Sequence, residues 1–175
     1  FTKMELKKYQ QKALDKIKDY LVEVNKFGPK HAFISIKGDK YQDEFFGDKV
    51  PFVCIKIPTG GGKTLVGCNA TTLILDSFLK EKMGRGIVMW FVPSEAIKSQ
   101  TLRKFKDRKD IHRKILDEYF DNNVKIFSNE EALKIRKEDI DNNLCIIISS
   151  LDAFRKEKSL QTKYKVYQEN GALIN

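Results

Sequence analysis

Hydrophobic positions at the start of the chain recur every three to four residues, which is the period of a helix with one apolar face. Polar residues separate these positions, which are Leu6, Tyr9, Ala13, Ile17, Tyr20, Leu21 and Val24. The pattern breaks over residues 27–49, where Gly28-Pro29, Gly38-Asp39 and Gly47-Asp48 mark turns. It predicts an opening amphipathic helix, followed by an irregular segment or a short hairpin over 27–49.

Four short apolar runs then alternate with stretches of helical pattern. The runs cover residues 50–57, 87–92, 124–127 and 144–148, and the helices are expected over 63–82, 94–108, 111–120 and 130–137. Strands that are apolar on both faces are typical of a parallel sheet covered on both sides. We therefore expect a three-layer α/β domain with a mainly parallel sheet over residues 1–175, in which 27–49 is an insertion before the first strand.

The composition is that of a soluble globular domain, with 41% hydrophobic and 33% charged residues among 175. The sequence contains no apolar run long enough to span a membrane, so a membrane partner is not expected. Its three cysteines lie singly and form no CxxC pair, which argues against a zinc site or a disulfide framework and favours the reducing cytoplasm. Much of the net charge of +9 lies in residues 94–115, which contain eight basic and three acidic residues. This local excess of positive charge favours a nucleic-acid partner.

A glycine cluster carries the clearest chemical signal, since it follows a predicted strand and opens a predicted helix. The segment is Pro58-Thr59-Gly60-Gly61-Gly62-Lys63-Thr64. Glycines let successive backbone N–H groups face phosphate oxygens, and the helix N-terminus adds partial positive charge. Lys63 is expected to reach the terminal phosphates of ATP, and the Thr64 hydroxyl to bind Mg²⁺. This segment is therefore predicted to be a P-loop, with Lys63 and Thr64 as its catalytic residues.

The P-loop departs from the general pattern GxxxxGK[ST], because Ile57 stands where the first glycine belongs. With its glycines next to the lysine, it resembles motif I of helicase superfamily two. That resemblance implies a RecA-like fold that binds ATP and Mg²⁺. The segment Leu6-Lys7-Lys8-Tyr9-Gln10 resembles the L-R-x-Y-Q opening of the same proteins, in which the glutamine reads adenine. Gln10 is thus a candidate adenine contact, and the alternative is a solvated helix residue like its neighbour Gln11.

Two further segments resemble motifs that contact the nucleic-acid backbone in this superfamily. The first follows the strand 87–92 and resembles motif Ia, with Pro93, Ser94, Lys98, Gln100 and Arg103 as candidate DNA contacts. The second follows the strand 144–148 and contributes Ser149 and Ser150. Hydroxyl, amide and basic groups of this kind contact phosphates without reading base sequence. The alternatives are a capped surface helix with a solvated basic face and a pair of helix-capping serines.

The motifs I-P-T-G-G-G-K-T and V-P-S-E-A-I are similar to those of the Res subunit of type III restriction–modification enzymes. The resemblance implies an ATP-dependent translocase that acts on double-stranded DNA as part of a site-specific endonuclease, with a methyltransferase (modification) subunit as partner. In this superfamily a D-E-x-H motif after a strand supplies the carboxylates for hydrolysis, and the sequence contains none. Asp117-Glu118 lacks the preceding apolar strand and is interpreted as a solvated helix face. We therefore expect the domain to be incomplete at its C-terminal end and the isolated chain to be inactive as an ATPase.

Other P-loop proteins remain as alternatives. A GTPase is not favoured, because the sequence lacks the D-x-x-G and N-K-x-D motifs. A small-molecule kinase would need no strict motif beyond the P-loop. A basic DNA-binding module with a vestigial P-loop would bind no nucleotide, so nucleotide affinity separates it from the motor domain.

Overall fold

The computed structural model describes residues 5–41, 49–79 and 85–154. The chain divides into two compact units, Phe1–Lys82 and Met83–Asn175, which are described one at a time. Within the described ranges, no helix is long and apolar enough to cross a membrane.

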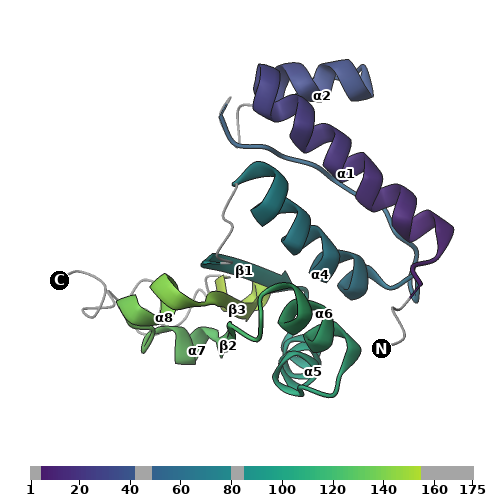
Figure 1. The fold of residues 1–175 in the computed structure, drawn as a ribbon. Helices are drawn as coiled ribbons and strands as arrows, with labels where there is room; N and C mark the ends of the chain where they lie inside the picture. The colour runs from purple at the N-terminus through teal and green to yellow at the C-terminus, as the bar shows by residue number, and fades with distance from the viewer. Residues whose placement is uncertain (1–4, 42–48, 80–84, 155–175) are drawn as a thin grey trace, which may run out of the picture. The chain divides into compact units, whose positions relative to one another are not determined.

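The described residues of unit 1 contain three helices, α1 (Lys8–Phe27), α2 (Pro29–Lys37) and α4 (Lys63–Leu73), and a π-helical turn, Ile74–Phe78, that continues α4 (Figure 1). The apolar face of α1 packs against α4 and against the residue that precedes the P-loop. Its buried cluster consists of Leu14, Ile17, Leu21, Ile57 and Val66. The predicted opening helix and the helix after the P-loop are thus confirmed as far as Phe78.

The irregular segment predicted over 27–49 is wrong for residues 29–37, which form α2. Pro29 occupies the first turn of this helix, where its fixed φ is favourable and its missing N–H leaves no hydrogen bond unmade. Gly38 ends the helix in the left-handed conformation, with φ of 69°. The turn signals at Gly28-Pro29 and Gly38-Asp39 therefore mark the two ends of a helix. The turn predicted at Gly47-Asp48 lies outside the described residues.

The strand predicted over 50–57 is also wrong in this structure. Residues 51–58 adopt no regular secondary structure, and no strand of the described sheet includes them. Val50, Val53 and Cys54 are exposed, whereas Ile57 is buried against α1. An apolar run becomes a strand only when a neighbouring strand pairs with its backbone, and no such partner lies among the described residues.

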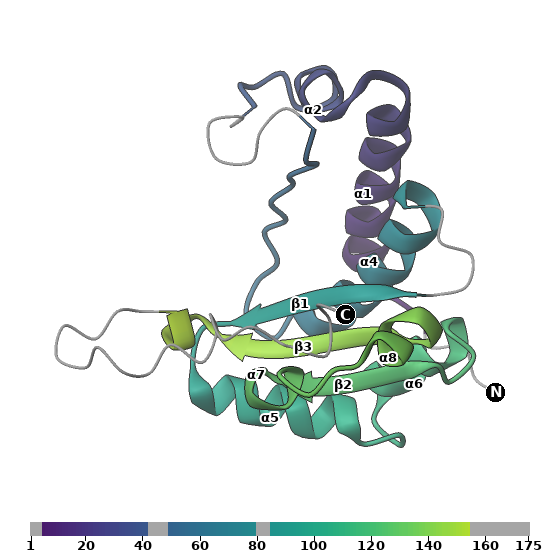
Figure 2. The same ribbon diagram turned by 90° about the vertical axis from the view of Figure 1, so that its left-hand side faces the viewer.

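Unit 2 contains a three-stranded parallel sheet made of β1 (Gly86–Val92), β2 (Val124–Ser128) and β3 (Leu144–Ser150), in the order β1-β3-β2. Helices α5 (Glu95–Lys106) and α6 (Ile111–Tyr119) connect β1 to β2, and α7 (Asn129–Ala132) and α8 (Lys137–Asn142) lead back to β3 (Figure 2). The connection from β2 back to β3 crosses the sheet in the opposite direction to the connection from β1 to β2. Right-handed crossovers therefore place the helices of the two connections on opposite faces of the sheet. Contacts agree, because Phe105 of α5 packs on Trp90, while Cys145, on the other face, donates to the Asp139 carbonyl of α8.

The predicted α/β class and parallel sheet are confirmed, as are the last three strands. β3 is central and every one of its residues is buried, which explains its continuous apolar run. The helix predicted over 130–137 is wrong, since α7 ends at Ala132 and α8 begins at Lys137. Glu131 accepts from the N-cap backbone of α7 and Asp139 from that of α8, so each short helix has its own start signal.

Candidate functional site

The segment 58–62 folds into a compact turn that leads directly into α4. Gly60 and Gly62 have φ of 75° and 78°, values that residues other than glycine rarely adopt. A Cβ on Gly61 would lie 2.7 Å from the Ile57 Cγ2 and 2.9 Å from the Pro58 carbonyl oxygen. Each of the three glycines is thus required by the backbone or by the space around it, as a phosphate-binding loop demands.

The N-terminus of α4 presents its first backbone N–H groups at this turn. Gly62 is the N-cap, and its carbonyl accepts the first helical hydrogen bond from Val66 at 3.0 Å. The N–H groups of residues 63–65 therefore have no partner within the helix and carry its partial positive charge. Lys63 is exposed, and its ammonium donates to the Pro58 carbonyl at 3.1 Å. An anion that approaches α4 would meet both these N–H groups and the Lys63 side chain.

The residues at this helix start fit a magnesium–nucleotide better than a protein-held metal. Thr64 supplies one hydroxyl oxygen in the first turn of α4. No group of three or more His, Cys, Asp and Glu residues that could hold a metal is found in the described part of the chain. Mg²⁺ commonly binds through few protein oxygens together with phosphate oxygens and water, so a single hydroxyl beside a phosphate loop is compatible with it.

Two side chains from α1 hold the P-loop. The Tyr9 hydroxyl donates to the Gly61 carbonyl at 3.0 Å, and the Gln10 amide nitrogen donates to the same oxygen at 2.9 Å. The Gln10 amide oxygen accepts from the Lys7 N–H at 2.9 Å. Gln10, predicted either to read adenine or to be solvated, is buried at 5% exposure, so the solvated alternative is wrong. The adenine contact stays a prediction, and in this structure both polar atoms of the Gln10 side chain already have partners.

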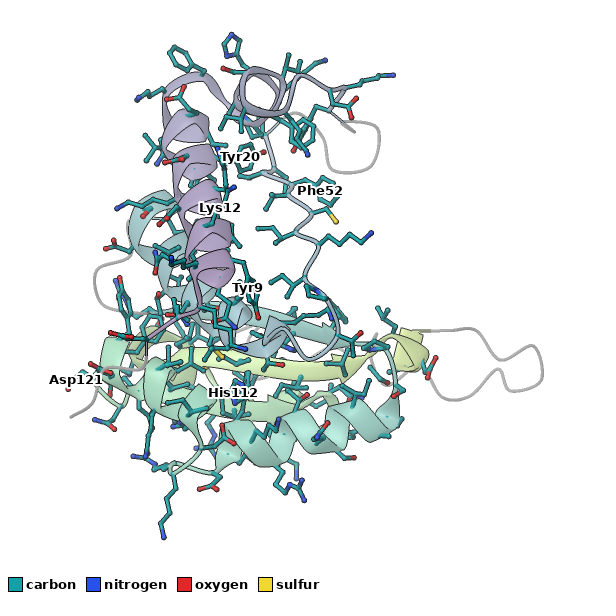
Figure 3. All side chains as sticks on the ribbon, turned by 90° about the vertical axis from the view of Figure 1, so that its right-hand side faces the viewer. Tyr9, Lys12, Tyr20, Phe52, His112 and Asp121 are labelled. Atoms are coloured by element: carbon teal, nitrogen blue, oxygen red, sulfur yellow. The ribbon has the colours of Figure 1, made fainter. Side chains whose placement is uncertain are left out.

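A groove of about 560 Å³ runs beside α1, between this helix, α2 and the extended segment 52–56. Figure 3 shows Tyr9, Lys12 and Tyr20 along α1 and Phe52 on the extended segment. Four lysines and no acidic residue line the groove, and they are Lys12, Lys16, Lys37 and Lys56. Tyr9 belongs both to this groove and to the contacts that hold the P-loop.

In unit 2, the two predicted DNA-contacting segments meet at the carboxyl end of the sheet. Val92 pairs with Ser150 in the parallel register, so the residues that follow β1 start beside the end of β3. Ser94 caps α5 by accepting from the Ile97 N–H at 3.5 Å. Ser150 donates its hydroxyl proton to the carboxylate of Glu95. The structure thus brings Ser94 and Ser150 to one edge, with Glu95 between α5 and β3.

Lys98 lies in a network of acceptors. Its ammonium is 2.9 Å from Glu95, 2.9 Å from the Asn129 amide oxygen and 3.4 Å from Glu130, and its side chain is only 9% exposed. Hydrogen bonds from Ser150 and then from Lys98 lower the pKa of Glu95, so this carboxylate stays ionised. Burial alone would lower the pKa of Lys98, but the hydrogen bond with Glu95 and the charge of Glu130 raise it overall. The two charges therefore stabilise each other in their ionised forms.

The other candidate DNA contacts differ in accessibility. Pro93, Gln100 and Arg103 are exposed, and the last two lie on α5. Ser149 is fully buried, and its hydroxyl donates to the Ser150 carbonyl at 3.4 Å. The exposed candidates are therefore concentrated on and just before α5, while Ser149, Ser150 and Lys98 face protein groups.

Asp117 and Glu118 lie in α6, in agreement with the absence of a strand before them. Glu118 is exposed, as interpreted, but the interpretation as a solvated helix face is wrong for Asp117. Arg113 and Asp117 are buried, at 5% and 7% exposure, and the Arg113 Nε donates to Asp117 at 2.8 Å. The same guanidinium donates to the carbonyls of Phe105 and Val124. This ion pair ties α6 to the end of α5 and the start of β2.

Sequence reasoning missed the roles of Tyr9 and Glu95. Both contacts join residues more than fifty positions apart, Tyr9 to Gly61 and Glu95 to Ser150. Tyr9 stands beside Gln10 in the L-K-K-Y-Q segment, and Glu95 stands inside P-S-E-A-I, so each lay within a motif without being assigned chemistry. A folded backbone was needed to show what each side chain reaches.

Comparison with known proteins gives one clear relationship. Residues 3–175 match the sequence model of the family described as type III restriction enzyme, res subunit. Comparisons with curated proteins and with solved structures gave no significant match. The family match extends over the P-loop, over α5 and over the end of β3.

Proposed function

Because the chain belongs to the type III restriction enzyme res subunit family and carries its helicase-like ATP-binding motor domain, we propose that it couples ATP hydrolysis to action on double-stranded DNA. ATP with Mg²⁺ is the proposed cofactor. The proposed partners are double-stranded DNA and a methyltransferase (modification) subunit within a site-specific endonuclease, as this family implies.

The conformation of the P-loop carries the nucleotide part of the proposal. Gly60 and Gly62 take up the left-handed conformation, Gly61 has no room for a side chain, and α4 begins immediately afterwards. Backbone N–H groups, a helix N-terminus and a lysine are the groups that bind the phosphates of a nucleotide. Lys63 would contact the terminal phosphates, Thr64 would bind Mg²⁺, and residues 58–62 would surround the phosphate chain.

The basic surface of α5 supports the DNA part of the proposal. The last turn of this helix carries Arg103, Lys104 and Lys106, and Arg103 and Gln100 are exposed. Such groups bind the phosphate backbone without reading base sequence, and that binding weakens steeply as salt rises. Arg103, Gln100 and the start of α5 at Ser94 are therefore the proposed first contacts with DNA.

Titration of the purified protein with Mg²⁺-ATP tests the nucleotide site. Lys63→Ala removes the positive charge over the terminal phosphates, and we expect ATP to bind at least about tenfold more weakly, which corresponds to roughly 1.4 kcal/mol. Lys56→Ala is the matched control, because Lys56 is exposed in the same unit and lines the groove. Equal ATP affinities of the wild-type protein and Lys63→Ala would contradict the proposed function.

A further inference from the structure

We propose that the groove beside α1 is a docking site for an acidic amphipathic helix of a partner protein. The groove lies between α1, α2 and the extended segment 52–56, all of which belong to unit 1. Residues 58–64 of the P-loop are not among those that line it. The proposed docking site is therefore separate from the proposed nucleotide and DNA sites.

One face of α1 forms a continuous wall of the groove. Its lining residues recur every three to four positions and therefore share a face of the helix, and they are Tyr9, Lys12, Ala13, Lys16, Ile17 and Tyr20. Figure 3 shows Tyr9, Lys12 and Tyr20 in this order along α1. At about 1.5 Å per residue the wall extends over about 16 Å, or about three helical turns. A partner helix of about three turns matches this length.

Apolar side chains on the walls of the groove are open to solvent. Tyr9 on α1, Ile36 on α2 and Val53 on the extended segment are 42%, 39% and 44% exposed. An amphipathic helix presents apolar side chains at positions i, i+3, i+4 and i+7, and it binds by burying them against such a groove. The apolar walls of this groove therefore suit the apolar face of a partner helix.

The groove also carries positive charge without a matching negative charge. Four lysines line it and no acidic residue does, and these are Lys12, Lys16, Lys37 and Lys56. Within the described part of the chain none of the four forms an ion pair, although other lysines on both units do. The three carboxylates of α1 all lie outside the groove lining. Carboxylates that flank the apolar face of a partner helix would complement these lysines.

The aromatic side chains of the groove are poorly placed to stack on bases, which disfavours single-stranded nucleic acid as the occupant. Such nucleic acids bind basic grooves through the faces of aromatic rings. Tyr20 is only 3% exposed, and Phe33 packs edge-on against it with ring centroids 6.4 Å apart. Phe33 also packs against Tyr41 at 5.5 Å. The exposed Ile36 and Val53 are aliphatic, so the groove favours apolar side chains over bases.

A designed peptide serves as the probe of this groove. We would measure the binding of the acidic peptide E-E-L-E-A-L-L-E-A-L-E-E to the purified protein by fluorescence anisotropy. The four leucines of this peptide share one helical face. In one control peptide every leucine is replaced by serine, and in a second every glutamate is replaced by lysine. A single-stranded oligothymidylate tests nucleic acid as the alternative occupant.

Four variants of the protein locate the binding site. Lys16→Glu reverses a charge in the groove, and Ile36→Ser removes an apolar side chain from its wall. Lys18→Glu and Ile34→Ser are the matched controls, because Lys18 and Ile34 are exposed on the same two helices outside the groove lining. All four substituted side chains are exposed, so we expect each variant to fold, and circular dichroism checks this.

We expect the acidic leucine peptide to bind at least about tenfold more tightly than the serine and lysine peptides, because it alone carries both apolar and acidic groups. Lys16→Glu and Ile36→Ser should each weaken its binding by about three- to tenfold, through lost charge pairing and lost apolar burial. Lys18→Glu and Ile34→Ser should stay within about twofold of the wild type, because solvent and salt screen charges outside the groove. Oligothymidylate affinity should respond to Lys16→Glu no more than to Lys18→Glu.

Three results would overturn the proposal. The first is that the acidic leucine peptide binds no more tightly than the serine peptide. The second is that either groove variant binds the acidic leucine peptide as tightly as its matched control. The third is that Lys16→Glu and Ile36→Ser weaken oligothymidylate more than their controls do, which would assign the groove to nucleic acid instead.

Discussion

Single residues decide which polar groups at the two candidate sites can meet a ligand. At the start of α4, the N–H groups of residues 62–65 have no helical acceptor, and Lys63 is exposed. In unit 2, by contrast, the polar groups of Lys98 and Ser150 already have a protein partner, because both bond to Glu95. The carboxylate of Glu95 therefore lies between the Lys98 ammonium and the Ser150 hydroxyl, two groups that the sequence predicts as phosphate contacts.

This arrangement predicts that Glu95→Gln strengthens DNA binding. The substitution removes a negative charge beside the proposed phosphate contacts, and it replaces the ion pair between Glu95 and Lys98 with a weaker neutral hydrogen bond. Because Glu95 is largely exposed and solvent screens its charge, we expect only about a two- to fivefold gain in affinity for a short duplex at low salt. The slope of log affinity against log salt should become steeper by about one, as Lys98 gains a phosphate contact. Fluorescence anisotropy over a range of salt concentrations measures both quantities.

Glu118→Gln is the control for the same change of charge, because Glu118 is exposed on α6. Arg103→Glu should weaken binding and flatten the salt slope if α5 contacts DNA. Equal affinities and slopes for Glu95→Gln, Glu118→Gln and the wild type would show that Glu95 does not compete with phosphate.

At the scale of helices and strands, the apolar patterns predicted which segments can be buried, but they did not predict which other element packs against each segment. The continuous apolar run 144–148 became β3 because strands pair with it on both sides. The similar run 50–57 met no partner among the described residues, and Val53 and Cys54 are exposed. Amphipathic spacing likewise predicted α1 and α6 to within a few residues, because one buried face is enough to define a helix.

The remaining errors have a common physical origin. Gly28-Pro29 is compatible with a turn and with the first turn of a helix, and only the packing of Ala32, which is fully buried beside Tyr20 and Val24, decides for α2. The candidate sites show the same division. The P-loop was predictable because the local backbone conformation itself requires glycine at these positions. The contacts of Lys98, Tyr9 and Asp117 were not, because they depend on partners brought together by tertiary structure.

Thiol labelling tests the contrast between segment 50–57 and β3. Cys54 is exposed, whereas Cys68 in α4 and Cys145 in β3 are fully buried. Burial, together with the nearby charge of Asp139, raises the pKa of Cys145 to about 11, so few of its thiols are ionised at pH 8. We expect iodoacetamide to modify Cys54 in the native protein and to reach Cys68 and Cys145 only in denaturant. Mass spectrometry of the peptides identifies the modified residues. Protection of Cys54 would show that this thiol is buried, as expected if segment 50–57 formed the strand that the sequence predicts.

At the scale of the whole molecule, each unit carries one of the two proposed binding sites. Unit 1 contains the P-loop and the α1 residues that hold it, and unit 2 contains the basic helix α5 and the edge at Ser150. Coupling between ATP and DNA would have to pass from one unit to the other. The proposed function therefore predicts that nucleotide and DNA affinities are linked, while each site keeps its own determinants in Lys63 and Arg103.

Nucleotide binding and hydrolysis make separate demands on this chain, and we expect the 175-residue chain to meet only the first. Hydrolysis needs a carboxylate for Mg²⁺ and a group that orients the attacking water, and losing both removes several kcal/mol of transition-state stabilisation. The sequence contains no D-E-x-H motif, and its Asp117-Glu118 pair lies in α6 with Asp117 bound to Arg113. Phosphate release from the purified chain should therefore equal the background, with and without DNA, while ATP still binds. Turnover that Asp117→Asn with Glu118→Gln abolishes, while the circular dichroism spectrum and ATP affinity stay as in the wild type, would instead show that these two carboxylates act on ATP. The chain would then hydrolyse ATP without a D-E-x-H motif.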